Sequence, residues 1–131
     1  MPKILIRNLF LFGTVSMAIG ILGLSIPQTI EGPILVSISE GHGLTLLDLF
    51  ALIPLILGTT IFEVGLWKNR ASISEYIQEH PRVTSSMLFG AGFGMGLLIA
   101  SAFSTFWWWW AIGSILMGIV VIAVTLWSLR Q

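Results

Sequence analysis

The chain alternates four long apolar stretches with three shorter connections. The apolar stretches run over residues 9–26, 44–67, 83–103 and 107–129. Because a helix rises 1.5 Å per residue, each stretch is long enough to cross the hydrocarbon core of a bilayer, which is about 30 Å thick. The pattern therefore predicts an all-α polytopic membrane protein, in which residues 1–131 form a single four-transmembrane-helix bundle.

The basic residues all fall on one side of this pattern. They precede the first stretch, lie in the connection over residues 68–82 or follow the fourth stretch: Lys3, Arg7, Lys68, Arg70, Arg82 and Arg130. Connections rich in Lys and Arg stay in the cytoplasm. We therefore expect an integral protein of a prokaryotic cell membrane, with both termini and the 68–82 connection cytoplasmic and the 27–43 connection on the outer side.

Composition narrows the functional classes. Of the 131 residues, 56% are hydrophobic and 9% are charged, so little remains for a soluble domain. The absence of cysteine excludes disulfides, thiolate nucleophiles and sulfur-ligated metals. No basic patch for nucleic acid, Gly-rich phosphate loop or nucleophile with a base is present. We expect a non-enzymatic protein without cofactor, metal or nucleic-acid partner.

Two segments of the chain resemble each other. Ala51 to Arg70 aligns without gaps on Ala111 to Arg130, an offset of 60 residues (111 − 51), with six identical positions. The tripeptide Leu11-Phe12-Gly13 recurs as Leu88-Phe89-Gly90. The matches predict two parallel-repeat helical hairpins related by an axis along the membrane normal, the second closed tightly at Ser104-Thr105. The alternative explanation is that Trp-x-x-Arg at an inner membrane boundary is an ordinary interfacial anchor. The other matches would then arise by chance, because the stretches use only a few apolar residue types.

Polar residues of the second stretch share one face when it is drawn as a helix with 100° per residue: Thr45, Asp48, Thr59 and Glu63. A charged side chain facing lipid costs several kcal/mol, so this face is expected to point into the bundle or a subunit interface. Glu63 is the candidate to bind a proton or a cation, with Asp48 at the outer mouth of the same path. Alternatively, both carboxylates are structural and reach interfacial water or neighbouring hydroxyls.

Glycines are dense in the third stretch, which reads FGAGFGMG. Small residues four apart let helices approach closely in a membrane. The expected packing glycines lie on three of the helices: Gly58, Gly90, Gly92, Gly94, Gly96 and Gly118. Their number exceeds what one four-helix unit needs, which favours an oligomer or a larger assembly.

The two long connections carry their own signals. In the inner one, Ser72 and Glu75 have the spacing of a capping box, which predicts a two-turn interfacial helix. Its apolar residues Ile73, Tyr76 and Ile77 would face lipid or the bundle. The outer connection has an apolar centre at residues 34–38, expected to pack on the bundle or a partner, or else to form a plain interfacial turn.

Tryptophans gather at the predicted membrane boundaries: Trp67, Trp107, Trp108, Trp109, Trp110 and Trp127. Such residues are typical interfacial anchors that sit among lipid headgroups. One or two of the indoles in the unbroken tetrad at 107–110 would alternatively contact a partner subunit, a quinone-like ring or a bound lipid.

The chain resembles two families of small membrane proteins in part, but it lacks the characteristic residues of both. Residues 103–106 resemble the Phe-Ser-Thr-Phe portion of a motif in small four-helix fluoride channels, whose arginine-bearing glycine motif and asparagine have no counterpart here. The length and number of spans are similar to those of small multidrug transporters, whose key glutamate lies in the first helix, where this chain has no acidic residue. Neither family is assigned.

These observations favour a non-enzymatic membrane subunit of a homo-oligomer or larger membrane complex, with membrane lipids and other subunits as partners. The alternative is a small channel or transporter, with an ion or proton path along Thr45, Asp48, Thr59 and Glu63.

Overall fold

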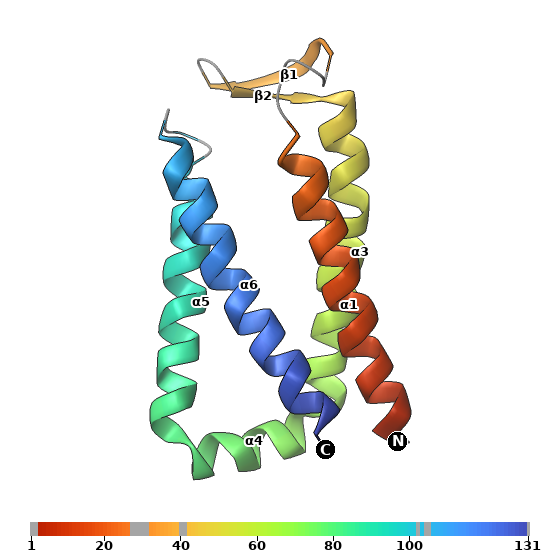
Figure 1. Ribbon diagram of the computed structural model, residues 1–131, viewed down its shortest axis with the longest axis vertical. Coiled ribbons are helices and arrows are strands. Elements are labelled where there is room, and N and C mark those ends of the chain that lie inside the picture. The colour runs from red at the N-terminus through yellow and green to blue at the C-terminus, as the bar shows by residue number, and fades with distance from the viewer. Residues whose placement is uncertain (1–2, 27–31, 40–41, 102, 104–105, 131) are drawn as a thin grey trace.

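The computed structural model describes residues 3–26, 32–39, 42–101, 103 and 106–130. Within these residues the elements follow in the order α1 (Lys3–Leu24), β1 (Ile34–Ser39), β2 (His42–Thr45), α3 (Leu46–Lys68), α4 (Arg70–Glu79), α5 (Pro81–Ser101) and α6 (Trp107–Leu129). Helices α1, α3, α5 and α6 are long and apolar enough to span a membrane, by length and composition. They form two pairs, α1 with α3 and α5 with α6 (Figure 1).

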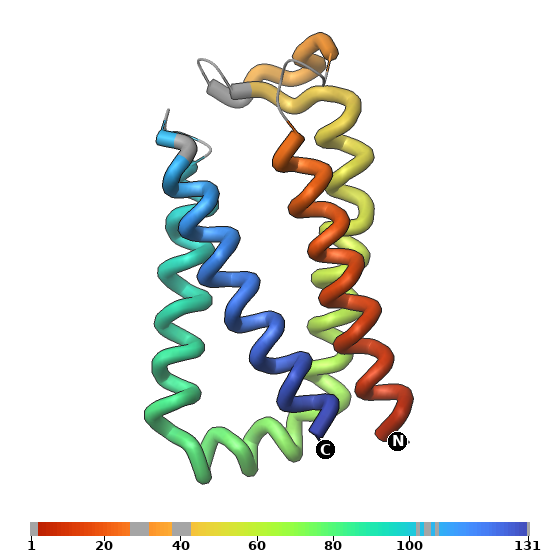
Figure 2. Tube along the Cα trace, in the orientation of Figure 1, coloured from red at the N-terminus to blue at the C-terminus, as the bar shows by residue number. Residues whose placement is uncertain are grey.

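The molecule has two distinct ends. Helix α4 lies across one of them, the α4 end, where both termini of the chain are also found (Figure 1). The small sheet of β1 and β2 lies at the other, the sheet end. The two pairs run in the same orientation along the chain. Helix α6 approaches α1 and α3 at the α4 end and lies farther from them toward the sheet end, whereas α5 stays apart from them (Figure 2).

The four predicted helices are present, with shifted boundaries. The fourth matches the prediction, whereas the first begins at Lys3 rather than residue 9. The apolar run marks only the hydrocarbon part of a helix, and Lys and Arg are good helix formers that extend it. The third begins two residues early at Pro81, because proline is favoured in the first helical turn.

The sequence pattern predicted no sheet in this mainly helical fold. Strands β1 and β2 pair antiparallel, with Ile34 opposite Thr45 and Ser37 opposite Gly43, and β2 delays the start of α3 to Leu46. Isoleucine and valine favour extended backbone, which explains why the apolar part of this connection forms a strand. Ile34, Leu35 and Val36 are each more than half exposed, so they do not pack on the bundle.

One predicted feature, the tight turn at Ser104-Thr105, lies outside the described residues.

Glycines bring α1 and α3 into backbone contact. A Cβ atom added to Gly58 would lie 2.6 Å from the Met17 nitrogen and 2.8 Å from the Gly13 carbonyl oxygen. One added to Gly20 would lie 2.8 Å from the Leu55 nitrogen. The fully buried Phe10 fills the space beside Gly65 on α3. This pair therefore holds the tightest packing of the fold.

Aromatic and hydroxyl contacts complete this interface and join it to α6. The Phe10 ring meets the Phe62 ring edge-on, with centroids 5.1 Å apart. The Ser16 hydroxyl on α1 donates to the Pro54 carbonyl oxygen on α3 at 2.7 Å. Between the two pairs, the hydroxyl oxygens of Thr14 on α1 and Thr125 on α6 are 2.7 Å apart. The link between the pairs thus includes a polar contact.

The second pair uses a different glycine contact. A Cβ added to Gly113 would lie 2.8 Å from the Gly94 carbonyl oxygen. The predicted repeat would instead match Gly13 and Gly58 with Gly90 and Gly118. A Cβ on Gly118 would meet nothing within 4 Å, and one on Gly90 would meet only Val120, at 3.9 Å. The glycine contact is therefore not reproduced, although the orientation of the pairs is.

The contact at Gly58 gives a first prediction. Gly58→Ala places a methyl group against the α1 backbone, so we expect the free energy of unfolding to fall by about 1–3 kcal/mol. Gly118→Ala adds the same group where nothing lies within 4 Å and should raise stability by up to about 1 kcal/mol through helix propensity. Thermal unfolding in mild detergent measures both, and equal effects would contradict the interface.

Candidate functional site

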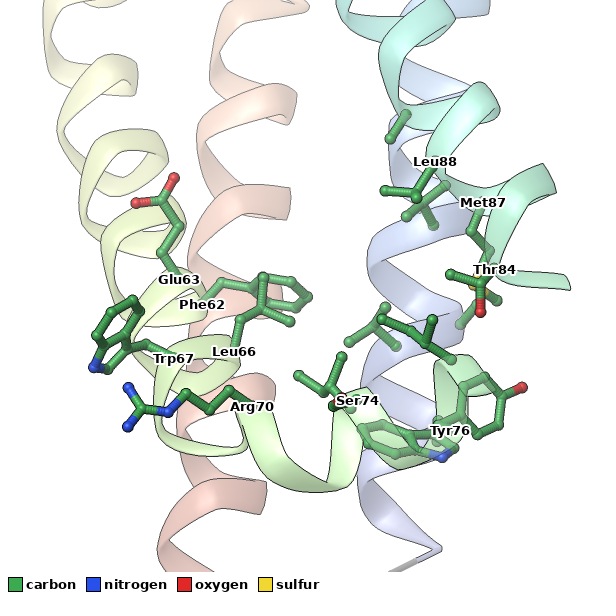
Figure 3. A pocket seen from close by; sticks show the side chains of 17 residues that line it. Phe62, Glu63, Leu66, Trp67, Arg70, Ser74, Tyr76, Thr84, Met87 and Leu88 are labelled. Carbon is green, nitrogen blue, oxygen red and sulfur yellow. The ribbon is translucent and has the colours of Figure 1, made fainter. Parts of the chain in front are cut away.

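A cavity of about 620 Å³ lies between the two helix pairs at the α4 end (Figure 3). Its walls come from α3, α4, α5 and α6, and we refer to it as the α4 cavity. The lining is mainly aliphatic and aromatic and includes Phe62, Leu66, Met87, Val120 and Trp127. Glu63 and Arg70 are its charged residues. Apolar walls with a few polar groups are typical of sites for small molecules or lipid chains.

Helix α4 forms the floor of this cavity. It is amphipathic and turns its apolar side toward the cavity. Ile73, Tyr76 and Ile77 line the cavity, while Glu75 and Glu79 are exposed, which confirms a helix here with one apolar face; its position at a membrane interface stays a prediction. The Tyr76 ring stands 5.3 Å from the Trp127 ring and stacks on His80 at 4.5 Å between centroids. The contact with Trp127 joins α4 to the end of α6, and the stack with His80 lies at the end of α4 itself.

The predicted capping box at the start of this helix is wrong. The helix begins at Arg70, so Ser72 lies within it, and its N-cap residue Asn69 makes no side-chain capping bond. Helix α3 ends at Lys68 and α4 follows after one residue, with the Ile73 amide donating to the Asn69 carbonyl oxygen at 3.1 Å. Because the helix starts this soon after the preceding one, Ser72 has helical backbone and cannot take the extended conformation of a capping residue.

The two charged residues of the α4 cavity point in different directions. The Glu63 side chain is exposed and extends along α3 away from Arg70 (Figure 3). The Arg70 guanidinium lies 4.9 Å from the centre of the Trp67 ring, a cation–π contact. Among the described residues, neither side chain has an oppositely charged group within 4.0 Å. Both charges are therefore available at the rim of the cavity.

Thr45 and Asp48 form a capping box at the other end of α3. The Thr45 amide donates to the Asp48 carboxylate at 2.8 Å, and the Asp48 amide donates to the Thr45 hydroxyl at 3.2 Å. Both residues are buried. This arrangement satisfies backbone donors at the start of the helix and accounts for Asp48 structurally. The Thr-x-x-Asp spacing is typical of such a cap, whereas the shared helical face predicted that both residues belong to a path.

The structure separates the predicted polar face into two parts. Asp48 and Glu63 are 15 residues apart on α3, about 22 Å along the helix. Thr59 is exposed and its hydroxyl donates to the Leu55 carbonyl oxygen of its own helix at 2.9 Å. Thr45 and Asp48 are thus brought together, and Glu63 joins the α4 cavity. A continuous path along this face stays a prediction.

The predicted packing glycines also divide. Gly58 and Gly94 make close interhelical contacts, and Gly90 a loose one. A Cβ on Gly92, Gly96 or Gly118 would meet nothing within 4 Å. Gly13 and Gly113, which were not among the predicted packing glycines, are the close partners of Gly58 and Gly94. Spacing alone does not tell which glycine on a helix faces its neighbour.

The tryptophans fall into two groups. At the sheet end, Trp108 and Trp109 are exposed and Trp110 is half-buried, while the side chain of Trp107 lies outside the described part. At the α4 end, Trp67 is 70% exposed at the rim of the α4 cavity, and Trp127 lines it. Their role as membrane anchors stays a prediction.

Comparison of the chain with protein-family models, with curated proteins and with solved structures found no match. Among the described residues, no group of three or more His, Cys, Asp and Glu side chains is placed to hold a metal ion.

A threonine in the wall of the α4 cavity provides a second prediction. The Thr84 hydroxyl oxygen is buried without a hydrogen-bond partner among the described residues. Thr84→Val removes an unsatisfied polar group at nearly constant shape, so we expect the free energy of unfolding to rise by about 1 kcal/mol.

The matched control is Thr125→Val on α6. The Thr125 hydroxyl donates to the Val121 carbonyl oxygen at 2.8 Å and contacts the Thr14 hydroxyl at 2.7 Å, so its loss should lower stability by about 1 kcal/mol. Unfolding in mild detergent measures both variants. A Thr84→Val protein that is less stable than the wild type would show that its hydroxyl has a partner.

Proposed function

We propose that this chain is a non-enzymatic membrane subunit that assembles with further copies of itself through α5. The observation that carries the proposal is the open face of this helix. Only 6% of its most apolar stretch is buried within the chain, the lowest share among the four long helices. Gly94 faces α6. Gly92 and Gly96 are each two residues away, a rotation of 200° at 100° per residue, so they lie on nearly the opposite side of the helix, where there is open space beside them.

Two phenylalanines share this open face. Phe89 and Phe93 are 74% and 53% exposed, and their rings stack in parallel planes with centroids 6.0 Å apart. At 100° per residue, residues 89, 92, 93 and 96 fall within one 100° sector of the helix. The face therefore offers a groove at the glycines beside an aromatic ridge, a shape into which the same face of a second copy can pack.

Membrane physics favours this use of the groove. Between lipid-facing helices no hydrophobic driving force acts, because lipid tails are as apolar as the side chains, so close packing at small residues drives association. Aromatic rings from two copies would add about 0.5–1.5 kcal/mol for each pair. Self-association is thus the simplest assembly consistent with the open face.

The proposed setting is a prokaryotic cell membrane with the α4 end in the cytoplasm. Support comes from the distribution of charge, since the basic residues lie in or next to the segments gathered at the α4 end. Within this setting the two helix pairs would be the two parallel repeats that the sequence indicates.

The assembly gives a third prediction. Wild type should run as an oligomer in native mass measurements in mild detergent, and Gly92→Leu or Gly96→Leu should shift it to monomer, because a leucine fills the groove. Gly118→Leu adds the same bulk in open space on α6 and should leave the mass unchanged. A monomeric wild type at all concentrations would refute self-association.

A small channel or transporter is the second candidate, and the position of Glu63 favours it. An ionisable residue at this depth of a membrane helix is costly unless it has a use, and Glu63 borders the α4 cavity rather than packing against α1. In this role Glu63 would bind a proton or a cation on its way past the cavity.

This candidate generates a fourth prediction. The purified chain in vesicles should carry a proton or cation flux that Glu63→Gln lowers strongly, since the amide cannot hold the charge. Glu75→Gln, at an exposed position of α4, is the matched control and should not change the flux. A flux that is insensitive to Glu63→Gln, or no flux at all, would exclude this role for the residue.

A further inference from the structure

The two charges of the α4 cavity differ in their depth along the long helices. Glu63 precedes Lys68, the last residue of α3, by five residues (68 − 63), which is about 7.5 Å along the helix. Arg70 is the first residue of α4 and lies beyond the end of α3. In the membrane setting proposed above, Arg70 reaches headgroups and water, whereas the Glu63 carboxylate borders an apolar cavity. The charge left to be balanced within the cavity is therefore negative.

Within the described residues, no cation of the chain balances Glu63. Its carboxylate has no Lys, Arg or His nitrogen within 4.0 Å, and it extends along α3 away from Arg70 (Figure 3). The Arg70 guanidinium instead lies over the Trp67 ring, 4.9 Å from its centre. An ionisable side chain within a membrane segment is costly unless a partner offsets its charge. This carboxylate is thus free to meet a cation that a ligand brings.

Aromatic rings are a second feature of the cavity that suits a cation. Four of its 17 lining residues are aromatic: Phe62, Trp67, Tyr76 and Trp127. The rings of Tyr76 and Trp127 are 5.3 Å apart and inclined at 56°, and Tyr76 stands across the cavity from Glu63 (Figure 3). The face of an aromatic ring attracts a cation within about 6 Å of its centre. The contact of Arg70 with Trp67 is one example at the rim of this cavity.

The apolar walls decide which kind of cation fits. A hard metal ion takes about six oxygen ligands, and the described residues place no group of three His, Cys, Asp and Glu side chains together. Aliphatic lining residues such as Leu66, Met87 and Val120 favour a body of alkyl or aryl groups instead. The volume of about 620 Å³ is in the range of sites for drug-sized molecules.

We infer that the α4 cavity binds a lipophilic organic cation, a quaternary ammonium or phosphonium ion that carries alkyl or aryl groups. Its positive centre lies near the Glu63 carboxylate, one of its groups packs against the rings of Tyr76 and Trp127, and the others fill the apolar space above α4. Because these groups shield the charge from water, such an ion loses little hydration when it enters the cavity. Aromatic sites for quaternary ammonium groups use the same attraction.

The inference names the ligand of the site that the second candidate function uses. It rests on the proposed membrane setting, but not on flux or on self-association. A chain that binds the cation in detergent and carries no flux in vesicles would exclude the channel or transporter and keep the site. The Gly92→Leu variant should bind the cation as the wild type does, so failure of the assembly can also be told apart.

The test uses two ions of the same shape and opposite charge, tetraphenylphosphonium and tetraphenylborate. Isothermal calorimetry measures their binding to the full chain in nonionic detergent. Wild type should bind one tetraphenylphosphonium ion per chain. Glu63→Gln should weaken this binding about tenfold, the effect of one close charge pair, and should not weaken the binding of tetraphenylborate. Each ion is compared between proteins at one detergent concentration, so its uptake by micelles is the same for both.

Matched controls separate the cavity from the rest of the surface. Glu75→Gln removes an exposed acid of α4 that does not line the cavity, and should leave tetraphenylphosphonium binding unchanged. Trp127→Leu removes a ring from the wall and should weaken the binding about threefold, whereas Trp109→Leu, at the sheet end, should not. Glu63→Gln alters an exposed side chain and decides the question even if Trp127→Leu unfolds.

Three outcomes would overturn the inference. Absence of tetraphenylphosphonium binding by the wild type would show that the cavity takes no such ion. Equal weakening by Glu63→Gln and Glu75→Gln would show that a general attraction to acidic residues replaces a site. Binding of tetraphenylphosphonium that Glu63→Gln leaves unchanged, or weakens only as much as that of tetraphenylborate, would show that the cavity takes apolar bulk such as an acyl chain without regard to charge.

Discussion

The backbone contact between α1 and α3 is the constraint on which the rest of the structure depends. Gly13, Gly20 and Gly58 have no side chains, so the two helices approach until backbone atoms of one lie within 3.0 Å of the place where a Cβ of the other would be. In a lipid environment this close packing replaces the hydrophobic effect as the source of stability. It also places Phe10 and Phe62, which are buried at the α4 end of this pair, and it fixes the face of α3 that borders the α4 cavity.

The sequence predicts the helices of this fold well because the membrane imposes a simple rule on composition. About 20 apolar residues must stand together wherever a helix crosses the hydrocarbon, and the four stretches were found on that basis. The rule says nothing about residues beyond the hydrocarbon. For that reason the early start of α1 at Lys3 and the strand at Ile34–Ser39 were not predicted.

The candidate sites were less predictable, since they depend on which face of a helix meets which neighbour. Periodicity placed Asp48 and Glu63 on one face, yet Asp48 serves the start of its helix, while Glu63 borders a cavity shared by four helices. Asn69 had no signal in the sequence. It is buried where the starts of α1 and α4 and the end of α6 meet, and only the folded arrangement brings these distant segments together.

The length of α4 has a geometric consequence for the space above it. A single residue joins it to α3 at one end, Asn69, and a single residue joins it to α5 at the other, His80. Its 10 residues therefore act as a spacer of about 15 Å between the axes of those two helices. Helices in direct contact stand roughly 8–10 Å apart, so this spacing exceeds what their own side chains bridge. The width of the cavity therefore follows from connectivity, and shortening or lengthening α4 by one turn would change it without altering the walls that α3, α5 and α6 provide.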